Sequence, residues 1–573
     1  MSSDMTSSQE SNLREIYDAN HRKVVLIFFP DPADILNLRM CGVAVVSGQS
    51  DCAIDVLTQL TSPRTIPRPR YASLRYIVHP NTGERLDRGL VLWFPGPHSF
   101  TGEDSCEIQI HGGVAVTKAI LEALSQLQGY EPAQPGDFTK RAFYNNKLDL
   151  TSIEGLGDLI HAETEAQRKQ ALHQMDGALN TLYSSWRRSL INARSRLEAY
   201  IDFSEDENIE DGVVAETEII VKRIIQELEK HLSDNRRGER LRSGLHLAII
   251  GPPNVGKSSL LNMLVQRPAA IVSPIPGTTR DILETTLDIG GYPVILSDTA
   301  GLRETDDIVE SEGVKRALDR AQNADLVLIL VEAFEMVLWM KSEEFSWEKF
   351  IKTYIKKLGI DCNLGNGVSE NYSSENFIER RESDINRWLE NNNYLILINK
   401  MDLLSVEDIN DLNHHLQDQC CLISVKTEEG LKFAMQKLVS KCSSLCEVGT
   451  AENPQLTTAR HRTHLTHCLQ NLQHILQPLE YSEFTCNYSY DTKMCDIIKS
   501  DSVMEIYSNR SPYQNEYDND ANIDQSLLSN ESTLLLAAHQ LQLASTQLGH
   551  ITGRITTEDV LDQIFSAFCI GKL

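Results

Sequence analysis

The chain has 573 residues, of which 41% are hydrophobic and 24% charged, and its formal net charge is −27. A single hydrophobic core stops growing at roughly 250 to 300 residues, so a globular chain of this length divides into about two to four domains. Such a negative charge excludes a protein that grips nucleic acid over its whole surface, so any RNA contact is local or supplied by a partner. No apolar run reaches the roughly 20 residues of a membrane-spanning helix.

The N-terminal part of the chain predicts a small α+β domain. Residues 1–40 show no Arg-rich, acid-poor pattern of a transit peptide and stay unassigned, with disorder as one interpretation. Over residues 41–147 short apolar runs (GVAVV, LVLWF and CEIQI) alternate with Gly and Pro turns. This alternation is typical of strands and turns, although it does not set their order.

A helical pattern then surrounds an α/β pattern. Residues 148–242 place Ile153, Leu156 and Ile160 on one helical face, and helical periodicity returns within residues 445–573. Between them, over residues 243–444, buried strands alternate with helices. The sequence therefore predicts a Ras-like α/β domain inserted into a discontinuous helical domain. Residues 334–390 and 480–530 are polar with little periodicity and are interpreted as insertions of low order.

The cysteines and histidines give no strong metal signal. Twelve cysteines lie in the chain without a CxxC pair, which is typical of a reducing compartment and argues against a zinc ribbon or a disulfide framework. His461, His464, His467 and Cys468 come closest to a ligand cluster. Their helical spacing spreads the three histidines around the helix surface, which disfavours a metal site.

A phosphate-binding loop follows the strand pattern LHLAII. GPPNVGKS at 251–258 matches GxxxxGK[ST], in which glycines let backbone N–H groups point at phosphate beside a helix N-terminus. Lys257 suits the β- and γ-phosphates, and the Ser258 hydroxyl suits Mg²⁺. The predicted contacts of this loop with the nucleotide are Asn254, Val255, Gly256, Lys257, Ser258 and Ser259.

Three further motifs follow in the order of a GTPase. DTAG supplies Asp298, Thr299, Ala300 and Gly301, near Mg²⁺ and the γ-phosphate; LILINKMD supplies Asn399, Lys400 and Asp402; and SVK supplies Ser424, Val425 and Lys426. A carboxylate at Asp402 can accept two hydrogen bonds from guanine, whereas adenine lacks that donor pair. The motif set therefore indicates GTP as the nucleotide.

Hydrolysis requires an oriented water and neutralised charge. Ras-like proteins place a glutamine just after the last glycine of DTAG, but Leu302 stands here. We expect the water to be held by the acidic run from Glu304 to Glu312. Asn254 is found in GTPases that bind a monovalent cation, and K⁺ could replace a missing arginine finger; a loop-shaping hydrogen bond is the alternative role for Asn254.

At this point the chain resembles the MnmE/TrmE family of tRNA modification GTPases. The resemblance rests on GPPNVGKSSLLN, IPGTTRD, DTAGLRE, WFPGPHSFTGEDSCEIQIHGG, PGDFTKRAFYNNKLDL and the terminal FCIGK. It implies an N-terminal folate-binding-type domain, homodimerisation, and a separate FAD-dependent subunit. It also implies modification of the wobble uridine of tRNA with GTP hydrolysis and a one-carbon tetrahydrofolate, either 5-formyl or 5,10-methylene. Mitochondrial relatives imply a mitochondrion as the compartment, with the cytoplasm as the alternative.

The resemblance also assigns roles by position. It places the catalytic glutamate at Glu310 and includes Cys569 as part of the terminal FCIGK motif, although Cys569 could also be an ordinary buried cysteine. The remaining positions are the K⁺ ligands Asn254, Ser273, Ile275 and Thr278, the Mg²⁺ ligands Ser258 and Thr279, and the folate contacts Glu107, Lys147 and Lys572.

Two departures from the family and two rival functions accompany this reading. GVAVVSG lacks the family's folate-contacting arginine, and the residues before Cys41 do not resemble the family's opening strand. A regulatory switch GTPase of ribosome or RNA assembly would share the nucleotide motifs but not FCIGK. A non-catalytic scaffold would not need Lys257, Ser258, Asp298 and Asp402 intact.

Overall fold

The computed structural model describes residues 23–28, 42–48, 52–203, 213–234, 236–265, 285–296, 324–342, 345–358, 393–446, 448–450, 453–476, 531–555, 561 and 564. The chain divides into two compact units. One unit comprises Met1–Ser185, Lys230–His464 and Gly549–Leu573, and the other comprises Trp186–Glu229 and Leu465–Leu548. Among the described residues, no helix is both long and apolar enough to cross a membrane.

The first sheet has seven strands in the order β3-β4-β5-β6-β2-β1-β7. Its strands are β1 Lys23–Phe28, β2 Gly42–Gly48, β3 Thr61–Ser62, β4 Ser73–Val78, β5 Arg85–Phe94, β6 Asp104–Ile110 and β7 Tyr130–Pro132. The helices α2 Cys52–Gln59 and α3 Val114–Ser125 share one core with the inward side chains Val91, Cys106 and Ile108. The expected strands GVAVV, LVLWF and CEIQI therefore correspond to β2, β5 and β6.

Strand β1 lies in the segment that the sequence left unassigned. KVVLIF at Lys23–Phe28 pairs antiparallel with β2 and parallel with β7. Its apolar residues run continuously rather than alternating, and a short run of this kind does not distinguish a strand from a buried helix. Disorder is thus the wrong interpretation for these six residues of 1–40.

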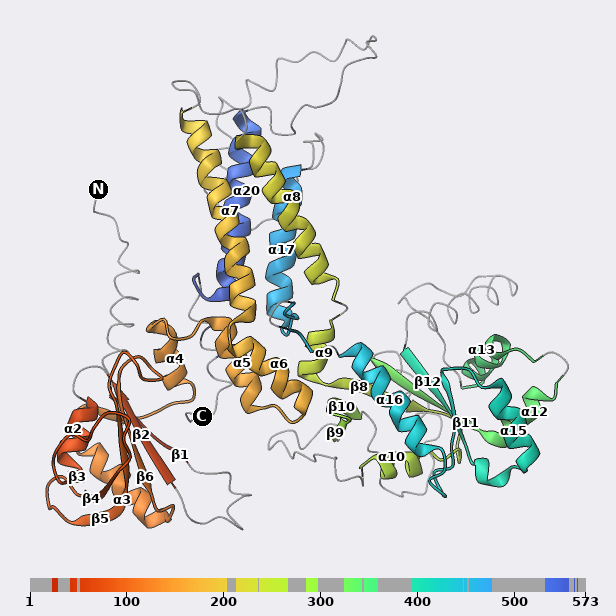
Figure 1. Cartoon of the computed structure of the whole chain (residues 1–573), viewed down its shortest axis with the longest axis horizontal. Coiled ribbons are helices and arrows are strands. Elements are labelled where there is room, and N and C mark those ends of the chain that lie inside the picture. Colours follow the sequence, from red (N-terminus) through yellow and green to blue (C-terminus); the bar gives the residue numbers. More distant parts are fainter. Residues whose placement is uncertain are drawn as a thin grey trace, which may run out of the picture. The chain divides into compact units, whose positions relative to one another are not determined.

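The second sheet, order β13-β12-β11-β8-β10-β9, is parallel except at β9. Its strands are β8 Leu245–Ile250, β9 Thr285–Ile289, β10 Tyr292–Leu296, β11 Leu326–Glu332, β12 Asn393–Asn399 and β13 Cys420–Leu422. One face packs against α10 Lys257–Val265 and α16 Leu431–Leu445, and the other against α12 Ala333–Met340, α13 Trp347–Lys357 and α15 Val406–His415. Figure 1 shows this sheet between its helices.

Helices α12 and α13 correct the expected low-order insertion at 334–390. Phe350, Ile351, Tyr354 and Ile355 on α13 are buried, and the Ser346 side chain caps the helix by accepting from the Lys349 N–H. The four apolar side chains recur at i, i+1, i+4 and i+5, which is one helical face. The polar composition of the whole stretch concealed this pattern; residues 359–392 and 477–530 lie outside the described residues.

The remaining helices include α4 Asp137–Tyr144, α5 Leu150–Ile160, α6 Glu165–Met175 and α9 Arg237–Ser243. Four long helices follow the expected periodicity: α7 Ala178–Phe203, α8 Val213–Leu232, α17 Ala459–Leu476 and α20 Glu531–Thr552. Their inward residues, such as Leu197, Leu228, Leu472 and Leu541, are fully buried. Figure 1 places these helices alongside one another. The chain thus returns to its helical part after the second sheet.

A buried ion cluster joins the helical segments on both sides of the second sheet. Arg460 donates to Glu154 Oε1 from Nε (3.0 Å) and Nη2 (2.9 Å), and His461 Nε2 lies 2.7 Å from Glu154 Oε2. Burial raises the pKa of Glu154, but His461 and Arg460 outweigh it and bring the pKa to about 2. Nearby, Arg462 pairs with Asp234 and Glu239 at 2.6 Å each. These contacts connect α5 and α9 with α17, more than two hundred residues apart in sequence.

The half-buried His231 predicts acid sensitivity. Its Nε2 lies 3.1 Å from the Tyr183 hydroxyl, and burial lowers its pKa from 6.5 to about 4. Because the unfolded chain binds a proton that the folded chain rejects, this contribution to stability is lost as pH falls from about 6.5 toward 4. We expect a loss of about 2 kcal/mol between pH 6.5 and about pH 5, at 1.36 kcal/mol per pKa unit.

His231→Gln is the matched variant, since glutamine keeps a hydrogen-bonding group for Tyr183. Because only the wild type carries this titrating group, its melting temperature relative to that of the variant should fall between about pH 7 and pH 5. Other titrating groups, such as Asp158 and His461, are present in both proteins. Their effects therefore cancel when the two melting temperatures are subtracted at each pH. A difference that does not change with pH would remove His231 as the cause.

Candidate nucleotide-binding site

The site lies where the parallel strands of the second sheet end. The phosphate-binding loop follows β8, Lys400 and Asp402 follow β12, and Ser424, Val425 and Lys426 follow β13. The carboxyl ends of parallel strands meet at one edge of a sheet, which is where such folds bind their ligands. The structure thus brings together three motifs that are up to about 170 residues apart in the chain.

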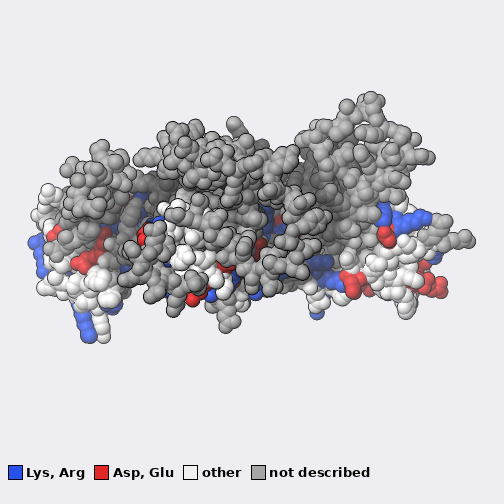
Figure 2. Space-filling view, turned by 90° about the horizontal axis from the view of Figure 1, so that it is seen from above, with Lys and Arg blue, Asp and Glu red and all other residues white. Residues whose placement is uncertain are grey.

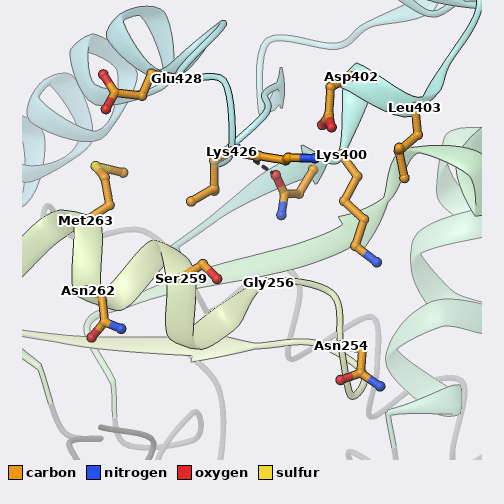
Figure 3. A pocket seen from close by; sticks show the side chains of 12 residues that line it. Asn254, Gly256, Ser259, Asn262, Met263, Lys400, Asp402, Leu403, Lys426 and Glu428 are labelled. Carbon is orange, nitrogen blue, oxygen red and sulfur yellow. Dashed lines mark hydrogen bonds between the residues drawn. The ribbon is translucent and has the colours of Figure 1, made fainter.

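A pocket of about 840 Å³ opens at this edge (Figure 3). This volume lies within the range typical of small-molecule sites, roughly 300 to 1,000 Å³. Its lining includes Asn254, Gly256 and Ser259 from the loop and α10, with Asn399, Lys400, Asp402, Val425 and Lys426 from the opposite side. In Figure 3, Asp402 and Lys426 lie across the pocket from Ser259.

The phosphate-binding loop has the backbone that its glycines predict. Gly256 has φ +106°, and a Cβ there would stand 2.4 Å from Asn399 Nδ2, so only glycine fits. Asn254 also has a positive φ, 61°, and its side chain is exposed. Lys257 Nζ donates to the carbonyls of Gly251 and Pro252 at 2.9 and 2.8 Å. Ser258, the second residue of α10, is exposed, which suits a hydroxyl ligand for Mg²⁺.

Asn399 links the two sides of the pocket. Its Nδ2 donates to the Val255 carbonyl (2.8 Å), and its Oδ1 accepts from the Val425 N–H (3.1 Å). The side chain is 3% exposed, so both bonds are shielded from water. A buried amide that makes two such bonds acts as a positioning residue. It sets the distance between the phosphate-binding loop and the loop after β13.

The side of the pocket formed by the loops after β12 and β13 is held by further contacts. Ser424 Oγ donates to Asp402 Oδ1 (2.7 Å) and accepts from the Thr427 N–H (3.1 Å). Asp402 Oδ2 has no hydrogen bond within the described part of the chain. Lys400 has φ 69° and pairs with Glu332 at 3.1 Å. Asp402 is thereby oriented at the pocket with acceptor capacity remaining for a ligand.

Sequence reasoning missed four lining residues: Asn262, Met263, Leu403 and Glu428. Asn262 and Met263 stand three and four positions after Ser259 on α10, so helical spacing could have found them. Leu403 directly follows Asp402. Glu428, at φ 63° in the loop after Lys426, had no comparable signal.

The remaining predicted site residues are not all described. Ser273, Ile275, Thr278, Thr279, Asp298, Thr299, Ala300, Gly301, Glu310, Cys569 and Lys572 lie outside the described residues. Glu107 lies on β6 between Leu92 and Val45 and, by strand alternation, on the face opposite α2 and α3. Lys147 follows α4 and donates from Nζ to the Pro97 carbonyl at 3.0 Å.

The histidines of α17 do not assemble into a metal site. His461 is buried against Glu154, Cys468 is fully buried, and His464 stacks on His550 with ring centroids 5.5 Å apart. Burial raises the pKa of the Cys468 thiol to about 12, which disfavours the thiolate that a metal needs. The described parts of the chain contain no group of three or more potential metal ligands.

Asn399→Ala tests the link across the pocket. The change removes the side-chain partner of the Val255 carbonyl and of the Val425 N–H. Leaving a buried polar group without its hydrogen bond costs about 1–3 kcal/mol of stability for each group. We expect GTP and GDP affinity to fall by similar factors, roughly tenfold or more, because neither contact involves the γ-phosphate. Asn262→Ala is the matched control, since Asn262 lines the same pocket but is exposed. Fluorescent-nucleotide titration of both variants would contradict this role if Asn399→Ala bound like Asn262→Ala.

Comparison with known proteins agrees with this geometry. Residues 37–147 match the model of the GTP-binding protein TrmE N-terminus, and residues 150–491 match the MnmE helical domain. The mitochondrial 5-taurinomethyluridine tRNA synthase subunit GTPB3 of Danio rerio is 43% identical over 537 residues, with 93% of this chain and 91% of that protein covered. The corresponding human protein is 41% identical over 93% of this chain and 91% of that protein.

A bacterial relative extends the match. The tRNA modification GTPase MnmE of Parvibaculum lavamentivorans is 40% identical over 531 residues, covering 93% of this chain and 97% of that protein. Identity of this extent spans the first sheet, the helices and the nucleotide site together. The chain therefore belongs to the MnmE/TrmE family of tRNA modification GTPases.

Proposed function

We propose that this protein hydrolyses GTP and takes part in modification of the wobble uridine of tRNA. The observation that carries the proposal is the pocket joined by Asn399, with Asp402 and Ser424 on its base side, in a chain whose relatives are named for tRNA modification. The modified base is of the 5-taurinomethyl or 5-carboxymethylaminomethyl type.

Guanine specificity is assigned to Asp402. Its carboxylate can accept from the N1–H and the N2 amino group of guanine, two charge-assisted hydrogen bonds that adenine cannot supply. The Ser424 contact at 2.7 Å holds one carboxylate oxygen and so limits rotation of the group. Lys426, on the loop after β13, supports the backbone contact to the base.

Hydrolysis is assigned to Glu310 together with a monovalent cation. Leu302 replaces the usual water-orienting glutamine, so the water is oriented by another side chain. Asn254 on the described loop is exposed beside the pocket and fits a K⁺ ligand, with Ser273, Ile275 and Thr278 completing the set by resemblance. Mg²⁺ is assigned to Ser258 and Thr279, and it supplies charge neutralisation at the β- and γ-phosphates when bound.

One-carbon folate is assigned to the first sheet. Glu107 on β6 can accept hydrogen bonds from the amino groups of a pterin, and Lys147 and Lys572 carry charge that suits the folate carboxylates. Strand β2 presents no arginine to this task, unlike the family. Binding of the folate tail therefore depends on the lysines.

Partners and compartment complete the proposal. The relatives named as a synthase subunit support a second subunit, which the family resemblance assigns as FAD-dependent. The mitochondrial names of several relatives support a mitochondrion as the compartment. We assign a homodimer built through the N-terminal domain.

Wobble-base analysis tests the proposal. Cells lacking the protein should lose the wobble-uridine group, measured by mass spectrometry of purified tRNA, and the wild-type gene should restore it. Lys257→Ala should not restore it at equal protein level, because the charge at the phosphates is gone. Intact modification together with abnormal ribosomal subunit profiles would instead identify a regulatory switch of ribosome assembly.

Glu310→Ala separates binding from hydrolysis. Removal of a water-orienting group costs on the order of 10² to 10⁴ in rate while ground-state binding changes little. We expect normal GTP affinity and slow turnover in K⁺, measured by phosphate release. The wild type should also slow strongly when Na⁺ replaces K⁺.

The neighbouring acids are the matched controls for Glu310. Glu304→Ala and Glu312→Ala should keep wild-type turnover if Glu310 alone orients the water. Equal loss in all three variants would mean that the acidic run acts only as a charged surface, and wild-type turnover in Glu310→Ala would remove it from the mechanism.

A further inference from the structure

The hairpin of β4 and β5 carries positive charge in an otherwise acidic protein. Residues 61–94 contain six arginines, no lysine and two acids, Glu84 and Asp87, although the whole chain has a net charge of −27. Asp87 is engaged by the His111 ring and backbone N–H at 2.7 and 2.8 Å. The positive charge of this hairpin is therefore largely left without local acids.

Three arginines beside or on the hairpin differ from many arginines elsewhere in the described chain, which pair with carboxylates. Arg141, Arg242 and Arg460, among others, form ion pairs with carboxylates at 2.7 to 2.9 Å. Arg68, Arg85 and Arg88 are exposed and form no ion pair within the described residues. Their guanidinium groups lie over tyrosine rings instead: Arg68 over Tyr71 at 4.5 Å, and Arg85 and Arg88 over Tyr76 at 4.2 and 5.3 Å.

The strand register places Leu74, Tyr76, Arg88 and Leu90 on one face of the β4–β5 hairpin. Tyr76 pairs with Arg88 across β4 and β5, and Leu74 pairs with Leu90 two residues further along the same face. Leu74 is 57% exposed and Tyr71, just before β4, is 58% exposed. The opposite face is occupied, since Arg75 is buried there and donates to Thr61 Oγ1 and the Pro63 carbonyl. Figure 2 shows Lys and Arg side chains projecting from this domain.

We propose that this hairpin surface, formed by Arg68, Tyr71, Leu74, Tyr76, Arg85 and Arg88, binds an unpaired loop of the tRNA directly. Arginines stacked on tyrosines keep their in-plane N–H groups available for phosphate, and an exposed tyrosine can stack on an unpaired base. A polyanion is repelled by a protein of this charge, so contact requires a local acid-poor surface of this kind. The inference rests on the tRNA role proposed above.

A second copy of the chain is the competing occupant. Two-fold interfaces bring the same patch of both subunits together, so an isologous contact here would set arginines without carboxylate partners against one another. Like charges placed together in this way disfavour association. The charge of the surface therefore favours RNA over a second subunit.

Anisotropy titration of fluorescent tRNA with the full-length protein tests the proposal, over a salt series from about 50 to 200 mM KCl. Changing Arg68, Arg85 and Arg88 together to Ala should weaken binding roughly tenfold or more at about 0.1 M salt. It should also reduce the slope of log K against log salt by roughly 2, as expected for three lost phosphate contacts to single-stranded RNA. Tyr71→Ala should weaken binding roughly tenfold with little change in slope, and Tyr71→Phe should bind like wild type.

Two controls separate charge from folding. The triple change to Lys should keep most of the salt slope, and Arg196→Ala should bind like wild type, since Arg196 is exposed but paired with Glu216 at 2.6 Å. GTP turnover without tRNA should be unchanged in every variant. If the wild-type protein showed no GTP turnover, that result would contradict the proposed function but not the RNA-binding role of this surface.

Either of two results overturns the proposal. The first is a triple Ala variant with the affinity and salt slope of the wild type. The second is a triple Ala variant whose dimerisation changes in analytical ultracentrifugation while its salt slope for tRNA does not, which would make the surface a subunit interface.

Discussion

The buried carboxylate of Glu154 is the contact on which the helical architecture depends. It accepts two bonds from Arg460 and lies beside His461, residues that enter α17 after the chain has completed the second sheet. A buried charge without partners is strongly unfavourable, so Glu154 requires both halves of the helical part to be present. Arg462, bonded to Asp234 and Glu239, repeats this arrangement one residue further along. Both clusters bind the beginning and the end of the insertion together, which lets an α/β domain interrupt a helical one.

The α/β domain is also held to the helical part by specific contacts near its hairpin of β9 and β10. The Ala166 N–H of α6 donates to the Gly291 carbonyl at the tip (3.1 Å), and Ala166 itself is part of the α/β core. Arg242 pairs with Asp158 of α5, and Arg240 with Asp325, each at 2.7 Å. Burial raises the pKa of Asp158 to about 6, although Arg242 opposes that rise. The hairpin lies in sequence between the IPGTTRD and DTAGLRE motifs, so α6 contacts the strands that connect these two motifs.

Charged side chains have different partners in different parts of this protein. In the helical part Arg196, Arg460 and Arg462 pair with carboxylates, which offsets their charge locally. At the nucleotide pocket, Lys400, Lys426 and Asp402 line one side, and Lys257 donates to carbonyls of the phosphate-binding loop. Three exposed arginines, Arg68 just before β4 and Arg85 and Arg88 on β5, lie over tyrosine rings and have no carboxylate partner within the described residues. One acidic chain can therefore offer a cation-rich surface to RNA without a basic composition overall.

The sequence by itself determined the nucleotide class and the general plan of the chain. The phosphate-binding loop, NKMD and the long amphipathic helices are local patterns whose chemistry lies within a few residues, so they could be recognised without a structure. Tertiary structure alone decided three features: the place of β1 in the first sheet, the burial of α13, and the role of Asn399 between Val255 and Val425. Each depends on partners far away in the chain. A continuous apolar run such as KVVLIF, or a single amide side chain, has no sequence pattern that identifies its partners. These partners are known only from the folded structure.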